Sequence, residues 1–292
     1  MAGWASDVVF CEPGGYDASR NLGVWKAGNL VLSVCASKGL AAGVGYRITL
    51  FVRNPRAAVV SPAMQVEASG SWRIVATEMQ KSQDNLFGVE NGTHPFFVVV
   101  GEFSLTYVAQ STPVAARQNT LTARFVLNVE ISGDVVSTIT ISGLFGSTAV
   151  DPLSSADGNS VGIDVFKKGE RAPALFCDSD QRQNRATWID DEASPYLKMT
   201  TCHNNSSSTV SPGTMIEVTW NVQNPIVDQE SSNVQIRASG PRVEIEAVNM
   251  TNSNATILGI QQGSSPMRVV LPAFTTKRIT QSTPASSASN VI

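Results

Sequence analysis

The chain has 292 residues, a hydrophobic content of 42% and a formal net charge of −3 at pH 7. This length allows one to three domains, and the apolar fraction is sufficient for packed cores. The weak negative charge offers no basic surface for nucleic acid or an anionic membrane. No apolar run reaches the roughly 18 residues of a transmembrane helix, so we expect neither nucleic acid nor a membrane as partner.

Strand-like runs follow one another along the whole chain. Short segments rich in Val, Ile, Thr and Phe alternate with breaks of Gly, Pro, Asn and Ser, and this pattern predicts an all-β sandwich fold. Residues 1–7 have neither the basic nor the apolar stretch of a signal peptide. Because the features below indicate secretion, we expect that a leader is missing from this sequence.

Each half of the chain holds a Cys-Trp-Cys series. The two series are Cys11, Trp25, Cys35 and Cys177, Trp188, Cys202. Four cysteines allow three pairings, and two copies of one fold should repeat one bond, so we predict the disulfides Cys11–Cys35 and Cys177–Cys202. The alternative is four buried free thiols. Each tryptophan is expected to pack near its disulfide, as in sandwich cores.

A strand-like segment after each series repeats as well. Residues Tyr46–Pro55 are repeated 170 positions later as Ile216–Pro225, and both segments end in Asn-Pro. Each strand is expected to end there, because proline cannot donate a hydrogen bond to a strand ladder. Strand side chains alternate between faces. The predicted inward residues are Tyr46, Ile48, Leu50 and Val52 in the first copy and Ile216, Val218, Trp220 and Val222 in the second. Two more blocks keep this register: Ala68–Gly70 with Ala238–Gly240, and Gln110–Pro113 with Gln281–Pro284.

These blocks predict two tandem immunoglobulin-like antiparallel β-sandwiches. We expect the first at residues 1–150, a linker at 151–164, and an incomplete second sandwich at 165–292. The units resemble those of extracellular, fibril-forming repeat proteins of algae and other aquatic protists, which carry the Asn-Pro strand end, the Ala-Ser-Gly block and a strand like Thr138–Leu144. The resemblance implies surface or fibrillar extracellular material and brings no catalytic residues.

The second copy ends earlier than the first. In the first copy, Gln110–Pro113 is followed by Leu121–Ile131, with six apolar residues on one face, and by Ser137–Leu144; the second copy stops at Ile292. A buried strand of this kind contributes on the order of 10 kcal/mol, and a whole domain is stable by only about 5–15 kcal/mol. We therefore expect an open apolar groove in the second copy, unless the natural chain continues beyond Ile292.

The predicted groove lies between the strand Ile216–Gln223 and the tail Phe274–Ile292, and a strand of another subunit is expected to fill it. The favoured donor is the N-terminal run, with Trp4, Val8 and Phe10 on one face. The runner-up is Val161–Phe166. Such a head-to-tail contact does not close on itself and generates a filament.

Five Asn-x-Ser/Thr sequons are candidate N-glycosylation sites in a secreted chain. They are Asn91, Asn204, Asn205, Asn249 and Asn254. Because Asn204 and Asn205 are adjacent, crowding should let only one of them carry a glycan. Glycans at these turns are expected to protect the chain from proteases.

No catalytic motif is present, and we predict neither an enzyme nor a cofactor. The two histidines, His94 and His203, lack a partner at metal-ligand spacing. The consecutive carboxylates at 190–192 alternate between faces in a strand and are poorly placed as a glycosidase pair. A weaker Ca²⁺ hypothesis rests on oxygen ligands in the linker: Asp151, Asp157, Asn159 and Asp164.

The favoured function is a structural subunit of an extracellular, N-glycosylated fibril or surface layer, with further copies of the chain and covalent glycans as partners. The alternative is a monomeric adhesin or receptor ectodomain that binds glycan or protein through sandwich loops. Only the first predicts fibres.

Overall fold

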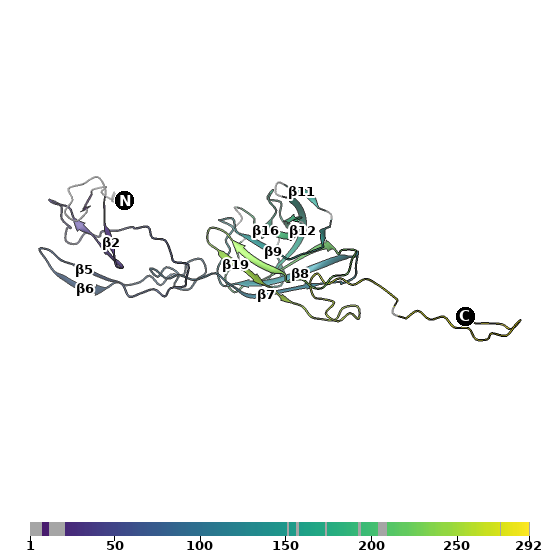
Figure 1. Ribbon diagram of the computed structural model, residues 1–292. Coiled ribbons are helices and arrows are strands. Elements are labelled where there is room, and N and C mark those ends of the chain that lie inside the picture. The colour runs from purple at the N-terminus through teal and green to yellow at the C-terminus, as the bar shows by residue number, and fades with distance from the viewer. Residues whose placement is uncertain are drawn as a thin grey trace. The chain divides into compact units, whose positions relative to one another are not determined.

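A computed structural model describes residues 8–11, 21–150, 152–155, 158–172, 174–191, 194–203, 209–274 and 276–291 (Figure 1). The regular elements of these residues are all strands, which confirms the predicted all-β class. The described part of the chain contains no helix that could cross a membrane. The chain divides into two compact units, Met1–Arg53 and Asn54–Ile292.

The described residues of the first unit form two short strand pairs. Strand β1 (Phe10–Cys11) pairs with β4 (Ser33–Val34), and β2 (Val24–Lys26) pairs with β3 (Asn29–Val31). The Cys11–Cys35 disulfide fastens the first pair. Residues 46–52 form no strand ladder, and their apolar side chains are exposed.

The second unit begins with a hairpin of β5 (Gln65–Ala68) and β6 (Ile74–Glu78). Its other strands belong to one large sandwich. They are β7 (Phe103–Gln110), β8 (Gln118–Leu127), β9 (Thr138–Ser142), β10 (Thr148–Ala149), β11 (Leu153–Ser155), β12 (Gly158–Lys167), β13 (Glu170–Arg171), β14 (Phe176–Cys177), β15 (Arg185–Ile189), β16 (Tyr196–Thr201), β17 (Met215–Gln223), β18 (Gln235–Ser239), β19 (Glu244–Asn249) and β20 (Thr251–Asn252).

Two sheets form the sandwich, and β12 takes part in both. The first sheet has the order β19-β18-β9-β16-β15-β12, and the second has the order β12-β17-β8-β7-β20. Residues 159–162 of β12 pair with β15, and residues 163–167 pair with β17. All of these ladders are antiparallel except the short β20–β7 contact.

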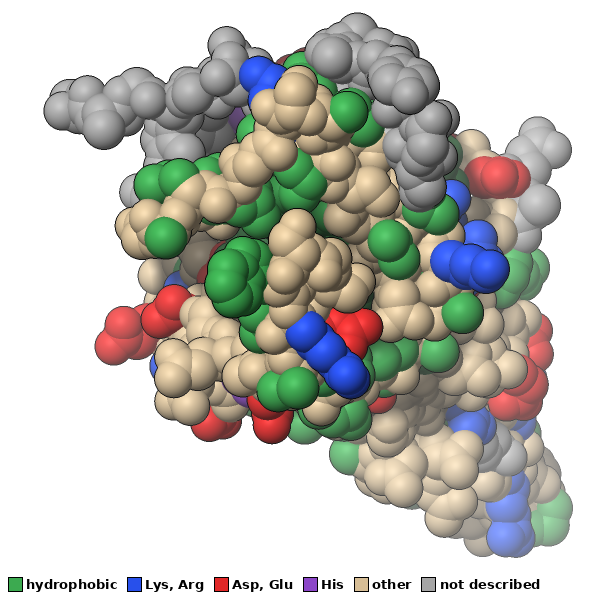
Figure 2. Space-filling model, turned by 90° about the vertical axis from the view of Figure 1, so that its left-hand side faces the viewer, with side chains coloured by type: hydrophobic (Ala, Val, Ile, Leu, Met, Phe, Trp, Pro, Cys, Tyr) green, Lys and Arg blue, Asp and Glu red, His purple; other side chains and the backbone are tan. Residues whose placement is uncertain are grey.

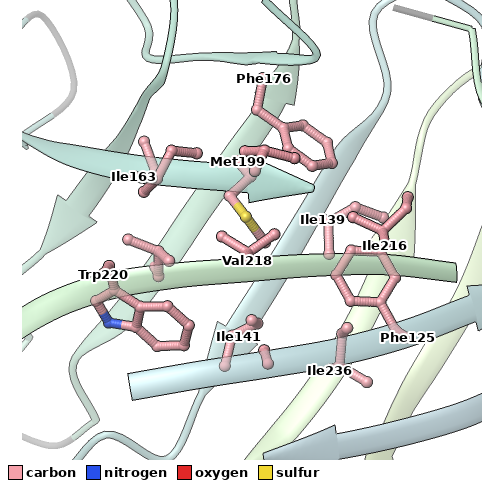
Figure 3. Close-up of a cluster of buried hydrophobic side chains, with 14 of the residues drawn as sticks. Phe125, Ile139, Ile141, Ile163, Phe176, Met199, Ile216, Val218, Trp220 and Ile236 are labelled. Atoms are coloured by element: carbon pink, nitrogen blue, oxygen red, sulfur yellow. The ribbon is translucent and has the colours of Figure 1, made fainter. Parts of the chain in front are cut away.

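The core lies between the sheets and follows the predicted alternation. Val218 and Trp220 of β17 and Phe125 of β8 meet Ile141 of β9 and Met199 of β16 (Figure 3). All five are at most 2% exposed. The Cys177–Cys202 disulfide closes the same body, where β14 pairs with the end of β16.

The ladder between β8 and β17 differs from the predicted arrangement of two separate sandwiches. All nine residues of β17 pair with β8, with Trp220 opposite Leu121 and Ile216 opposite Phe125. Strand β9 likewise inserts between β16 and β18. The last strands of the first copy therefore complete the second copy, so the predicted boundary at residue 150 and the open groove are both wrong. The expected linker 151–164 contains β11 and most of β12.

Charge explains part of this choice of partner. Glu217 of β17 lies opposite Arg124 of β8, and the Arg124 Nε is 2.5 Å from the Glu217 carboxylate. The corresponding residue of the first copy is Arg47. Like charges directly opposite one another in a ladder are unfavourable by a few tenths of a kcal/mol to about 1 kcal/mol, so β8 is better matched to the second copy.

Candidate assembly surface

A tight turn between β7 and β8 fixes the junction of the two copies. We call residues 110–120 the first plug. The Asn119 side-chain oxygen accepts hydrogen bonds from the Ser111 and Thr112 backbone N–H groups, both at 3.1 Å. Its amide donates to the Gln110 oxygen at 3.1 Å and to the Asn224 side-chain oxygen at 2.9 Å. Asn119 is 1% exposed, so a buried amide joins the two copies.

The groups that hold this plug form a receiver, which we define as Asn224–Pro225 and the loop 255–270. The Asn224 amide donates to the carbonyls of Thr112 and Val114 at 3.1 and 2.9 Å. The Gln110 amide donates to the carbonyls of Gly263 and Arg268 at 3.0 and 2.7 Å.

Backbone pairing adds to these side-chain bonds. Val270 N–H donates to the Pro113 carbonyl at 2.7 Å, and Ala115 N–H donates to the Val270 carbonyl at 3.1 Å. Val114 and Val270 form a parallel bridge. Buried polar groups must be paired to avoid a desolvation cost, and here plug and receiver satisfy each other.

The chain carries a second plug. Residues 281–291 form the same turn (yellow in Figure 1): Asn290 Oδ1 accepts from Ser282 N–H at 2.9 Å and Thr283 N–H at 3.1 Å, and its amide donates to the Gln281 oxygen at 3.2 Å. In both plugs the backbone N–H of the residue after the asparagine also donates to the serine hydroxyl. The Thr120 N–H lies 2.8 Å from the Ser111 hydroxyl, and the Val291 N–H lies 2.9 Å from the Ser282 hydroxyl. The described hydrogen bonds of this second plug stay within it.

The chain also carries a second receiver, Asn54–Pro55 with the loop 84–99. Its sequence Leu86–Val99 matches Ile257–Val270, a further repeat that is not among the blocks of the sequence-based prediction. Short bridges join Leu86 with Val89 and Ile257 with Ile260, and a glycine with positive φ, Gly88 or Gly259, lies between the two partners. Both loops therefore have the same backbone turn.

The two receivers differ in burial. In the receiver 255–270, Asn224 is 2% exposed, and Gly263 to Met267 are all buried. In the second receiver, Asn54 is exposed and Val99 is 37% exposed. No described residue forms a plug on it.

The predicted donor strands are wrong. Val8 precedes β1, and Phe10 pairs with Val34 of its own unit, while Val161–Phe166 is part of β12. The predicted groove residues Ile216, Val218, Trp220 and Val222 are at most 2% exposed in the sandwich core, and β8 pairs with their strand. Phe274 is 83% exposed. Trp4 and Ile292 lie outside the described residues.

Both predicted disulfides are present in the structure, and no described cysteine is free. Their tryptophans differ in burial. Trp188 is 1% exposed, as expected for a sandwich core, whereas Trp25 is 50% exposed and does not fill a core. Trp25 lies on the short β2, whose counterpart β15 is covered by the opposite sheet.

Three sequons can be placed. Asn249 at the end of β19 and Asn254 are exposed, and Asn249 Oδ1 accepts a hydrogen bond from the Gln235 amide at 3.0 Å. Asn91 is half-buried in a turn with positive φ. Asn204 and Asn205 lie outside the described residues. Glycosylation at all five sites stays a prediction.

The Ca²⁺ hypothesis gains no support from the residues that can be placed. Asn159 and Asp164 lie at odd spacing on β12 and therefore face opposite ways. Asp164 pairs instead with Arg171 at 2.5 Å. Asp151 and Asp157 are outside the described residues, and the described part of the chain holds no cluster of potential metal ligands.

One buried carboxylate escaped the sequence analysis. Asp178, directly after Cys177, is fully buried and accepts hydrogen bonds from the Ser160 hydroxyl and from both the backbone N–H and the Nε of Arg182, the latter two at 2.9 and 2.7 Å. Burial opposes its ionisation, but these donors and the Arg182 charge hold the pKa of Asp178 below its usual range. The only feature of the sequence that could have predicted a paired Asp178 is Arg182, four residues later.

No protein-family model and no curated protein matches the chain. Similar solved structures include an uncharacterised protein from Nocardia farcinica with an immunoglobulin-like fold, at 12% identity and TM-score 0.25, covering 56% of this chain and 97% of that one. Others are the pilus 2b backbone protein of group B streptococcus (8% identity, coverage 50% and 56%, TM-score 0.24) and BcpA, the major pilin subunit of Bacillus cereus (6% identity, coverage 69% and 67%, TM-score 0.30). At these TM-scores the likenesses carry no argument about function, and the resemblance to algal and protist proteins stays a prediction.

Proposed function

We propose that the protein is a non-catalytic structural subunit of an extracellular, N-glycosylated fibril or surface layer, and that it associates with further copies of itself. The observation that carries the proposal is a contrast between equivalent positions. Ile48, Leu50 and Val52 are 42–51% exposed. Their counterparts Val218, Trp220 and Val222 are at most 2% exposed, because β17 pairs with β8 and its inward face packs against the opposite sheet.

Exposed apolar side chains in this number favour association. Phe51, Val60 and Trp72 are 99, 84 and 85% exposed, and hydrophobic side chains reach the surface at many points of the face drawn in Figure 2. Large exposed apolar patches mark interaction surfaces in soluble proteins. A second molecule that pairs with residues 46–52 and covers them would supply the burial that the sandwich supplies to β17.

The extracellular location is supported by cysteine chemistry. All four cysteines are in disulfides, which form and persist in oxidising compartments. The exposed positions of Asn249 and Asn254 are compatible with glycan attachment.

Electron microscopy and light scattering of the protein purified from a secreting host test the proposal. We expect polymers whose length grows with protein concentration, and N-glycans released by enzymatic treatment. A monodisperse monomer across the micromolar range would overturn the structural-subunit function.

The closed sandwich favours one second candidate, a monomeric adhesin or receptor ectodomain. The described strands between residues 103 and 252 form a sandwich in which β8 already occupies the edge of β17. Loops at its ends could bind glycan or protein. A monomer that binds a glycan array through these loops would support this candidate and would remove the need for self-association.

A further inference from the structure

We propose that the second plug, residues 281–291, docks into the receiver formed by Asn54–Pro55 and the loop 84–99 of a second copy of the chain. This inference rests on the proposed function and names its interface. It also reverses the direction of donation expected from the sequence. The C-terminal segment now supplies the inserted residues, and the receiver of the first copy, Asn54–Pro55 with the loop 84–99, accepts them.

The chain contains its own template for this contact. The first plug, 110–120, is held by Asn224–Pro225 and the loop 255–270 through paired amides and backbone hydrogen bonds. The second plug and the second receiver repeat the residues that make these bonds: Gln281, Asn290, Asn54 and Gly92 stand for Gln110, Asn119, Asn224 and Gly263. The same chemistry therefore predicts the same docking.

The second plug and the loop 84–99 already have the backbone turns that docking requires. The second plug keeps the hydrogen bonds of the first to within about 0.2 Å, and both contain a residue with positive φ at the same place, Ala116 at 56° and Ser287 at 62°. In the receivers, Phe87 and Leu258 have φ of 52° and 53°. Preformed partners lose little conformational entropy on binding.

A side-chain bridge inside the loop is also repeated. The hydroxyls of Ser82 and Thr93 are 2.9 Å apart, and Thr93 donates to the Asp84 carbonyl at 2.8 Å. The equivalent Ser253 and Ser264 hydroxyls are 2.7 Å apart in the occupied receiver. The loop 84–99 thus holds its shape by internal bonds and does not need the plug to form.

The template assigns the contacts of the docked plug. The Asn54 amide donates to the carbonyls of Thr283 and Ala285, and the Asn290 amide donates to the Asn54 side-chain oxygen. The Gln281 amide reaches the carbonyl of Gly92, and Ala285 lies beside Val99 as Val114 lies beside Val270.

A glycan on Asn91 would not block this interface. Asn91 corresponds to Gln262, which remains exposed in the occupied receiver, with its side-chain oxygen bound by Arg268 on the outside of the loop. Assembly and glycosylation of the same loop are therefore compatible.

Cysteine trapping between two full-length variants tests the proposal. One variant carries Val99→Cys, and the other, with a size tag, carries Ala285→Cys. Paired strands lie about 4.8 Å apart, within the range that a disulfide bridges. We expect a mixed disulfide-linked dimer under mild oxidation, and its mass should identify one chain of each kind. The matched control is Thr276→Cys, because Thr276 is also exposed and lies in the tail outside the plug; this variant should give at least tenfold less mixed dimer.

A second variant separates recognition from folding. Asn54 is exposed and outside the sandwich, so Asn54→Ala should leave the thermal unfolding of the chain unchanged. It should weaken association by at least about tenfold, because three hydrogen bonds are lost. Polymers that form without a Val99–Ala285 cross-link would overturn this interface and leave the proposed function standing. A monomer without cross-linking would overturn both. A third variant carries Val99→Cys and Ala285→Cys in one chain, and if it stayed monomeric with an internal cross-link, docking between copies would be overturned.

Discussion

Replacing Phe125 with alanine tests the strand exchange between the two copies. Phe125 belongs by sequence to the first copy, yet it is fully buried opposite Ile216 and meets Phe103 edge-on, with ring centroids 6.0 Å apart. A buried aromatic side chain removes roughly 150–250 Å² from water, which at about 25 cal/mol per Å² gives around 4–6 kcal/mol. Measured Phe-to-Ala costs in cores are about 3–5 kcal/mol.

The decisive observation is which part of the protein loses stability when Phe125 is replaced. Trp188 and Trp220, both buried in the sandwich, report its unfolding by fluorescence, and hydrogen exchange follows the amides of β17. We expect Phe125→Ala to lower the melting temperature of this signal by roughly 10 °C, since about 1 kcal/mol corresponds to roughly 2–4 °C for a domain of this size. Protection of β17 should fall in parallel.

The matched control is Phe51→Ala, because Phe51 is 99% exposed; its effect on the same signal should stay within about 0.5 kcal/mol. If Phe125→Ala left β17 and the two tryptophans unaffected and instead altered residues 24–78, the two copies would be separate sandwiches. The ladder between β8 and β17 would then be refuted.

Three further predictions follow from the disulfides, the buried carboxylate and the sequons. Non-reducing peptide mapping should find Cys177 linked to Cys202, and reduction of this bond, which closes a loop of 25 residues, should cost about 3 kcal/mol of stability; a bond between copies would contradict the pairing. Asp178 has a lowered pKa in the folded state, so its ionised form stabilises the fold above the unfolded pKa near 3.8, and this contribution is lost as pH falls through the folded pKa. Asp178→Asn should therefore destabilise the chain by about 1–3 kcal/mol at pH 7, and the gap to the unmodified protein should narrow below about pH 4; Asp164→Asn, in an exposed ion pair, should change stability by less than about 1 kcal/mol at either pH. Enzymatic deglycosylation followed by mass spectrometry should convert Asn249 to Asp, and an unconverted Asn249 in protein from a glycosylating host would rule out a glycan there.

Local patterns in the sequence determined much of the structure. The alternation of Ile216, Val218, Trp220 and Val222 predicted their inward face, because a strand repeats every two residues whatever its partner. The cysteine pairs could be predicted because two copies of one unit should repeat one bond, and the structure has that bond in each copy. The all-β class followed from composition and turn residues in the same way.

The partners of the strands were decided only by the tertiary structure. An apolar alternating strand such as β8 fits any sheet edge with a matching face, and two copies of one unit offer two such edges, so its sequence alone leaves the choice open. The ion pair of Arg124 with Glu217 distinguishes the second copy, which has Glu217, from the first, which has Arg47, only when the segments are brought together. Contacts between residues about a hundred positions apart depend on which surfaces meet, and the local period of either segment contains no information about that.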